Sequence, residues 1–244
     1  MNPLREITPS VWQLPFPVGH VYVVALPGGG YALVDTGIPG SAPAVLDALA
    51  RLGGRPHDLR EIVLTHSHLD HIGSAADLVA ATGARVLAGA LDAPYISGTV
   101  PEPPPVLTPA ERSLYDGITA RFAAEQVPPP APVRVDTELH DGDTLPGWPG
   151  EARVLHVPGH TPGSIALHLP GSRLLFPGDI IGADPEGRRA VLGPGNTERE
   201  TAIASFRRLA ALEDVDTVCV PHGGPIRGDA RAVLAAATPE KDWL

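Results

Sequence analysis

The chain has 244 residues, of which 43% are hydrophobic and 19% are charged, and its formal net charge is −10. This length and composition indicate a globular protein with one sizeable core, and they argue against disorder despite 29 Pro and 27 Gly. The acidic balance, without any basic run, argues against a nucleic-acid or anionic-membrane partner, because phosphate groups need a positive surface.

The cysteine content and the N-terminal segment indicate in which cellular compartment the protein is expected. Cys219 is the only cysteine, so an intrachain disulfide and a Cys-rich metal framework are excluded, and its apolar neighbours predict a core position. The segment Met1–Ser10 lacks the basic and apolar parts of a signal peptide, and no apolar run approaches 18 residues. We expect a cytoplasmic protein without a membrane span that acts on a small molecule; a homodimer stays open.

The first half of the chain alternates short β-type runs with helical patterns. A helix is predicted over about Ala42–Leu52, and a second one follows residue 71 and continues to about Ala81, before Gly83. The strands predicted in this half are Val11–Leu14, His20–Leu26, Tyr31–Val34, Glu61–Leu64 and Arg85–Ala88.

The range from about 90 to 150 is rich in proline, which disfavours regular structure. Within it, Thr108 has the properties of a helix cap, with Pro109 at the first helical position and Glu111 at the third. This pattern predicts a helix from Thr108 to about Gln126. The helix is interpreted as a cap over a site; the alternative is a surface excursion that does not contact substrate.

The second half returns to strands and helices. Strands are predicted over Ala152–Val157, Ser164–Leu169, Leu174–Phe176 and Thr217–Val220, and helices over about Thr197–Leu212 and Gly228–Ala237. Both halves therefore favour an α/β fold in which two sheets pack face to face with helices outside.

A dense cluster of metal-ligand residues follows the predicted strand that ends at Leu64. His66, His68, Asp70 and His71 lie within six positions. Imidazole and carboxylate together suit Zn, Fe or Mn, and four such residues exceed what one tetrahedral ion needs if substrate is to bind. The spacing therefore favours two ions. The alternative, a polar loop with chance histidines, would be costly beside a core strand.

Three later strand ends each carry one further candidate ligand. His160, Asp179 and His222 all follow apolar strands, and Gly and Pro neighbours allow tight turns there. A single residue of this kind is usually only part of a turn. Repetition at successive strand ends favours a shared site on loops held by a rigid sheet.

The pattern His-x-His-x-Asp-His at 66–71, followed by His160, Asp179 and His222, resembles the metallo-β-lactamase superfamily. The Asp35-Thr36-Gly37 turn resembles the opening motif of the same family, and the resemblance extends from about residue 11 to residue 222. It implies an αββα four-layer sandwich, with two mixed β-sheets flanked by helices. The expected domain is a single one over 1–244, with the proline-rich helical cap inserted at about 90–150.

The resemblance also implies roles for the candidate ligands. One ion would be held by His66, His68 and His160, and the other by Asp70, His71 and His222. Asp179 would bridge both ions, and Asp35 would orient a ligand imidazole or serve only as a turn residue. The implied cofactors are two divalent ions, with Zn expected and Fe or Mn as alternatives.

Asp179 distinguishes branches of the superfamily. The β-lactamases mostly lack a bridging aspartate at this turn, whereas the glyoxalase II and lactonase branches have one, so β-lactam hydrolysis is not expected. Glyoxalase II carries a helical domain after the last ligand, but only 22 residues follow His222 here (244 − 222). The glutathione-binding module of that enzyme is therefore not expected.

The implied activity is that of a dinuclear metal-dependent hydrolase. A metal-bridging hydroxide would cleave an ester, thioester or lactone carbonyl, and Asp70 would be catalytic by passing a proton to the leaving group. Two alternatives stay open. One is a mononuclear iron persulfide dioxygenase of the same superfamily, with its iron on His66, His160 and Asp179. The other is a binding protein on an inactive scaffold.

Substrate contacts are predicted from two segments. Arg188 and Arg189, in the loop 182–196, could grip a carboxylate or phosphate, although they could equally be solvated surface charges. Tyr115 and its apolar neighbours on the predicted cap helix would supply an opposite wall. Together these segments predict a small substrate with an anionic end and an apolar body.

Overall fold

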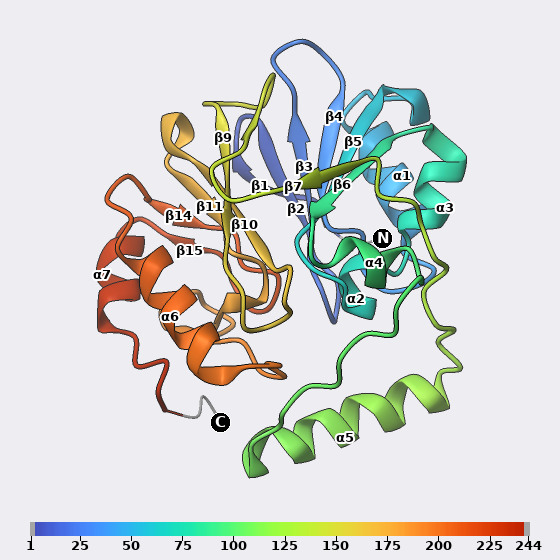
Figure 1. The fold of residues 1–244 in the computed structure, drawn as a ribbon. Coiled ribbons are helices and arrows are strands. Elements are labelled where there is room, and N and C mark those ends of the chain that lie inside the picture. The colour runs from blue at the N-terminus through green and yellow to red at the C-terminus, as the bar shows by residue number, and fades with distance from the viewer. Residues whose placement is uncertain (1–2, 242–244) are drawn as a thin grey trace.

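Two β-sheets packed face to face form the centre of the molecule, which is described here by a computed structural model (Figure 1). The structure describes residues 3–241; the ends of the predicted domain, 1–2 and 242–244, lie outside the described residues. In spatial order, the first sheet consists of β1 (Arg5–Thr8), β2 (Val11–Leu14), β3 (Val21–Ala25), β4 (Tyr31–Val34), β5 (Leu59–Leu64), β6 (Arg85–Gly89) and β7 (Thr137–Leu139). The second consists of β15 (Ile226–Arg227), β14 (Thr217–Val218), β11 (Leu174–Phe176), β10 (Ile165–Leu169), β9 (Ala152–His156) and β8 (Thr144–Leu145).

Both sheets are mixed, as predicted. Strands β1 to β4 pair antiparallel, whereas β4, β5, β6 and β7 pair parallel. In the second sheet β11 and β14 are parallel and the other pairs are antiparallel. Since β7 and β8 lie within the proline-rich range 90–150, that range also supplies one edge strand to each sheet. A separate hairpin, β12 (Ile181–Ala183) with β13 (Ala190–Leu192), was not predicted.

Alternation of side chains along the strands produces three apolar layers. In β3, Val21 and Val23 face the helices beside the first sheet, whereas Tyr22 and Val24 face the second sheet. The second sheet shows the same division, because Leu167 faces inward and Ala166 faces its own helices. Each sheet is therefore buried on both faces, which explains why its strands are almost continuously apolar.

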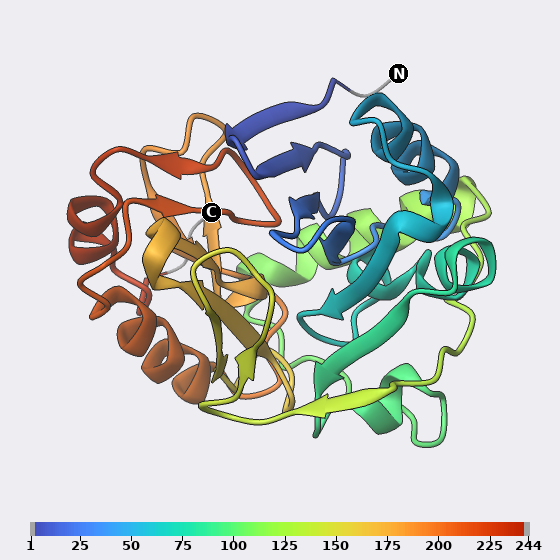
Figure 2. The ribbon, with the colours of Figure 1, turned by 90° about the horizontal axis from the view of Figure 1, so that it is seen from above.

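Helices cover the outer face of each sheet (Figures 1 and 2). The first sheet carries α1 (Ala42–Arg51) and α3 (Ala75–Thr82), and the second carries α6 (Arg199–Ala210) and α7 (Ala230–Ala236). Two short helices, α2 (Leu69–Ile72) and α4 (Ala93–Ile96), lie in loops of the first half. This arrangement confirms the predicted four-layer sandwich.

The helix predicted to continue to about Ala81 is interrupted, which corrects the sequence-based boundary. Gly73 lies between α2 and α3 and packs directly against the backbone of Ile38 and Pro39. Ser74 adds a second tie, because its hydroxyl accepts from Ser41 N at 2.8 Å and donates to Ile38 O at 2.8 Å. The long-range contact with the 38–41 turn therefore breaks a segment whose local pattern is helical.

Helix α5 (Pro109–Ala124) lies below the sandwich, apart from the other helices (Figure 1). It begins at the predicted capping box, in which Thr108 Oγ1 accepts from Glu111 N and Glu111 Oε2 accepts from Thr108 N at 2.7 Å. Of its residues only Glu111 is fully buried. Among residues 3–241, no helix combines the length and apolarity needed to cross a bilayer.

Glycine allows the closest approach between two loops near the sheet edge. Gly19 has a φ of +65°, and a Cβ placed on it would overlap the backbone oxygen of Asp70. Only glycine fits both requirements. The β2–β3 connection therefore packs directly on the loop that carries the histidine cluster.

We predict that Gly19→Ala destabilises the protein more than Gly29→Ala. Both positions have positive φ, which costs about 1 kcal/mol for alanine. Gly29 has open space where a Cβ would lie, whereas Gly19 meets Asp70, which adds about 1–3 kcal/mol of overpacking. Urea unfolding of the two variants measures the difference; equal losses would show that the approach to Asp70 is not tight.

Candidate metal centre

Seven histidine and aspartate side chains converge where four strands end at one edge of the sandwich. Four of them follow β5, and one each follows β9, β11 and β14. Their potential ligand atoms form two groups, each with all atoms within 4.8 Å of one another. The groups are His66, His68, His160 and Asp179, and Asp70, His71 and His222.

In the first group, three ring nitrogens face one another. His68 Nδ1 lies 3.1 Å from His66 Nε2 and 2.8 Å from His160 Nε2. Hydrogen bonds alone cannot satisfy three ring nitrogens at these separations. A nitrogen that donates its proton needs an unprotonated nitrogen opposite it, so the three cannot all carry protons. A divalent cation between them would accept all three lone pairs.

Asp179 lies between the two groups. Its Oδ2 is 3.4 Å from His160 Nε2 and 3.3 Å from His222 Nε2, and its Oδ1 is 3.3 Å from His71 Nε2. Asp70 belongs to the second group, with Oδ2 3.4 Å from His71 Nε2 and 3.2 Å from His222 Nε2. Oδ2 is thus near nitrogens of both groups and Oδ1 is near the second group, so this carboxylate is well placed to serve two ions.

Burial keeps the imidazoles of His66 and His160, in the first group, neutral. The pKa of His66 is well below its usual value, because burial and the adjacent His71 both disfavour the imidazolium form. Burial and the neighbouring His68 lower the pKa of His160 to about 3. Neutral imidazoles present free lone pairs, which is the form that binds a metal.

The second group has the opposite electrostatics. Burial alone would lower the pKa of His71, but the charges of Asp179, Asp70 and Asp35 outweigh it and raise that pKa well above the usual value. Burial is likewise outweighed at His222, where Asp179 and Asp70 raise the pKa to about 10. The carboxylates thus hold positive charge beside them, either as imidazolium or as a bound cation.

These residues fit divalent metal ions. His71 Nε2 and Asp179 Oδ1 are buried side-chain atoms without a hydrogen-bond partner in the described part of the chain, and they lie 3.3 Å from each other, one in each group. Neutral imidazoles together with carboxylates are the donor set that Zn and similar ions prefer. His222 and His68 remain partly exposed, at 34% and 21%, so the site is open to solvent on that side.

Asp35 connects the β4 turn to the second group. Its Oδ2 lies 2.9 Å from His71 Nδ1, and its Oδ1 accepts from Thr65 N at 2.8 Å. Asp35 has a φ of +62°, an uncommon backbone conformation for a residue other than glycine. Asp35 thus holds the outer nitrogen of His71, and this contact directs Nε2 of the same ring at Asp70 and Asp179.

Asp92 joins two ligand loops and was not identified from the sequence. Its buried carboxylate accepts from Ser67 N at 2.9 Å, from Thr161 Oγ1 at 2.6 Å and from Gly163 N at 2.6 Å. It therefore ties the loop of His66 and His68 to the loop of His160. The only sequence signal was an Asp before the short helix α4, which is indistinguishable from an ordinary helix start.

His20 supports the loop of His222 from the β2–β3 connection. Its Nδ1 accepts from Phe16 N at 3.2 Å, so Nε2 carries the proton and donates to Gly223 O at 3.0 Å. Burial lowers the pKa of His20 to about 4, which keeps this tautomer neutral. His20 thus acts on the backbone beside a candidate ligand rather than as a ligand.

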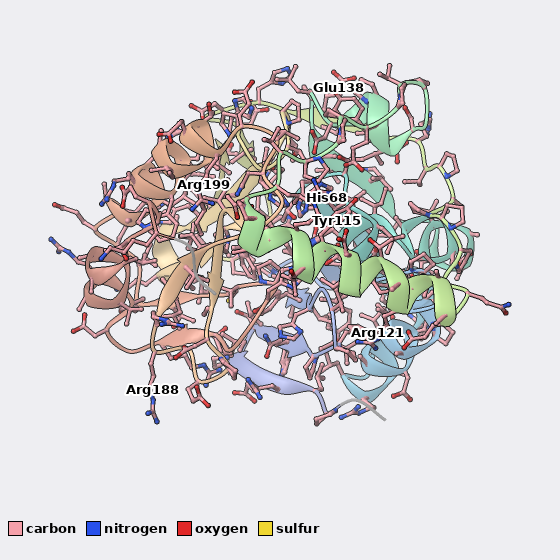
Figure 3. All side chains as sticks on the ribbon, turned by 90° about the horizontal axis from the view of Figure 1, so that it is seen from below. His68, Tyr115, Arg121, Glu138, Arg188 and Arg199 are labelled. Atoms are coloured by element: carbon pink, nitrogen blue, oxygen red, sulfur yellow. The ribbon has the colours of Figure 1, made fainter. Side chains whose placement is uncertain are left out.

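The predicted role of Arg188 and Arg189 in substrate binding stays a prediction. Both side chains are exposed at the tip of the β12–β13 hairpin, and Figure 3 shows Arg188 at the periphery, far from His68. Asp184 fixes this tip by accepting from the backbone N–H groups of both arginines. Tyr115, which is 43% exposed, lies on α5, and this helix crosses the side of the molecule where His68 is seen (Figure 3).

Comparison with known proteins places the chain in a family. A model of the metallo-β-lactamase superfamily matches residues 14–222. A probable metallo-hydrolase of Bacillus subtilis, YflN, is 28% identical over 91% of this chain and 87% of its own length. A hydroxyacylglutathione hydrolase of Fuscovulum blasticum is 36% identical over 85% of this chain and 62% of its own.

Solved structures agree with this result. A metallo-β-lactamase of Cronobacter sakazakii has a TM-score of 0.66 and 27% identity, covering 89% of this chain and 80% of its own. The chain spans 58–62% of the length of the first hydroxyacylglutathione hydrolases that it matches. With the family model matching most of its length, this chain belongs to the metallo-β-lactamase superfamily.

Proposed function

We propose that this protein is a dinuclear metal-dependent hydrolase of an ester, thioester or lactone. The observation that carries the proposal is the position of Asp179, whose two oxygens lie within 3.3–3.4 Å of ring nitrogens from both groups. His66, His68 and His160 would hold one ion, and Asp70, His71 and His222 the other. Zinc suits this donor set best.

Two divalent ions held by these residues would lower the pKa of a bound water molecule to about 7 and would polarise the carbonyl of the substrate. The protein contributes a fixed arrangement of side chains around that chemistry. Burial would raise the pKa of Asp70, but His71 and His222 outweigh it and keep that pKa well below its usual range. Asp70 therefore stays ionised and, at 18% exposure, can orient a water molecule, accept a proton from it and pass that proton to the leaving group.

The proposed substrate class follows from this arrangement and from the relatives. The hydroxyacylglutathione hydrolases are named for a thioester substrate, which supports an acyl group on sulfur or oxygen. Arg188 and Arg189 are exposed at the hairpin tip, and their contact with an anionic end of the substrate stays a prediction. Tyr115 on α5 is retained as a proposed contact for the body of the substrate.

We predict that removing metal abolishes hydrolysis and that about two equivalents of Zn²⁺ restore it. The measurement is a chelator-treated sample titrated with Zn²⁺ and assayed on thioesters, lactones, aryl esters and a β-lactam, with elemental analysis of the untreated protein. We expect turnover of one or more of the first three substrate classes and none of the β-lactam. One iron per chain with oxygen uptake would instead support the dioxygenase, and β-lactam turnover would contradict the proposed substrate class.

We also predict that Asp179→Ala is more damaging than Asp35→Ala. Loss of a residue that only orients a ligand imidazole costs about 10–100-fold in activity or metal affinity. Loss of a carboxylate that serves both groups should reduce kcat/KM further and lower the metal content. Asp116→Ala, a change on the exposed face of α5, is the control. Equal and mild effects of Asp179→Ala and Asp35→Ala would show that Asp179 does not join the two groups.

A further inference from the structure

The inner and outer nitrogens of the ligand imidazoles follow a pattern. His66 directs Nε2 inward while its Nδ1 lies 3.0 Å from Thr65 Oγ1, and His71 does the same with Nδ1 2.9 Å from Asp35. His68 is reversed: Nδ1 faces the other ligands and Nε2 faces outward. Among the described residues, the outer Nδ1 of His160 has no hydrogen-bond partner, so the surroundings of the outer nitrogen of His68 must be established separately.

Glu102 lies at that outer nitrogen. Its Oε1 is 3.7 Å from His68 Nε2, and the same oxygen accepts a short hydrogen bond from Ser67 Oγ. The separation from His68 is longer than a hydrogen bond, but the Glu102 side chain is 36% exposed and has room to turn. Its neighbours Pro101 and Pro103 restrict the backbone, which limits the entropy lost in presenting the carboxylate.

The segment that carries Glu102 is fastened at its other end as well. We name residues 102–111 the strap. Val106 N donates to Asn196 O at 2.9 Å, and Gly195 N donates to Glu111 Oε1 at 3.3 Å. The adjacent Thr197 N donates to His160 O at 3.1 Å. The strap therefore runs from the loop of His68 to the segment that contacts the loop of His160, and it ends in α5.

We propose that Glu102 is a positioning residue for His68. Its carboxylate accepts the Nε2 proton, so that the Nδ1 lone pair points at the first ion; this assignment rests on the proposed metal site. An acidic side chain that faces the outer nitrogen of a ligand imidazole fixes its tautomer and strengthens it as a ligand. Through the strap, the same contact links metal binding to the position of α5.

The test is a Zn²⁺ titration of the metal-free protein in competition with a chromophoric chelator. Glu102→Ala should weaken binding of one ion about 10–100-fold and leave the other unchanged. Glu102→Gln should lose less, because its amide oxygen still accepts from Ser67 and His68. Glu125→Ala, which removes a carboxylate paired with Arg121 on the surface of α5, should bind as the wild type does.

Thermal unfolding of the metal-free variants separates positioning from a structural role. We expect the Tm of metal-free Glu102→Ala to match that of the wild type. A Tm loss that accounts for the weaker binding would overturn the assignment, as would wild-type affinities for both ions in Glu102→Ala. If the wild type binds two ions normally, such a result refutes only the role of Glu102. A wild type that binds no ion would overturn the proposed function and this assignment together.

Discussion

The concentration of charge at one edge of the sandwich is the constraint on which the rest of the structure depends. Asp70 and Asp179 lie among imidazoles in a largely buried setting, where an unpaired carboxylate would be very costly. Raised pKa values at His71 and His222, with lowered values at His66 and His160, show how the residues divide this charge. One group is ready to donate lone pairs and the other requires positive charge.

The fold meets this constraint by fixing each ligand loop from outside. Asp35 ties the β4 turn to Thr65 and His71, while Asp92 ties the loop after β5 to the loop after β9. Buried strands bring the loops to one edge. Close glycine contacts, such as that of Gly19 with Asp70, allow neighbouring loops to pack directly on one another. Ligand geometry is thereby set by rigid elements, which is what a preorganised site requires.

The sequence predicted those parts of the structure that have a local pattern. Apolar runs marked most strands of both sheets, the Thr108 capping box marked the start of α5, and the histidine pattern marked the loops that converge. The break at Gly73 and the pairing of β7 and β8 depend on contacts between distant segments, so no local pattern indicates them. Asp92 and Glu102 make their contacts with residues that are distant in the sequence, so no local pattern indicates these contacts either.

The central claim is that Asp179 joins two metal positions. Anomalous diffraction from a crystal of the Zn²⁺-loaded protein, recorded on both sides of the zinc absorption edge, tests it most directly. The account predicts two anomalous peaks, one beside His66, His68 and His160 and one beside Asp70, His71 and His222, with Asp179 between them. A single peak at one group, or two peaks that Asp179 does not contact, would contradict it.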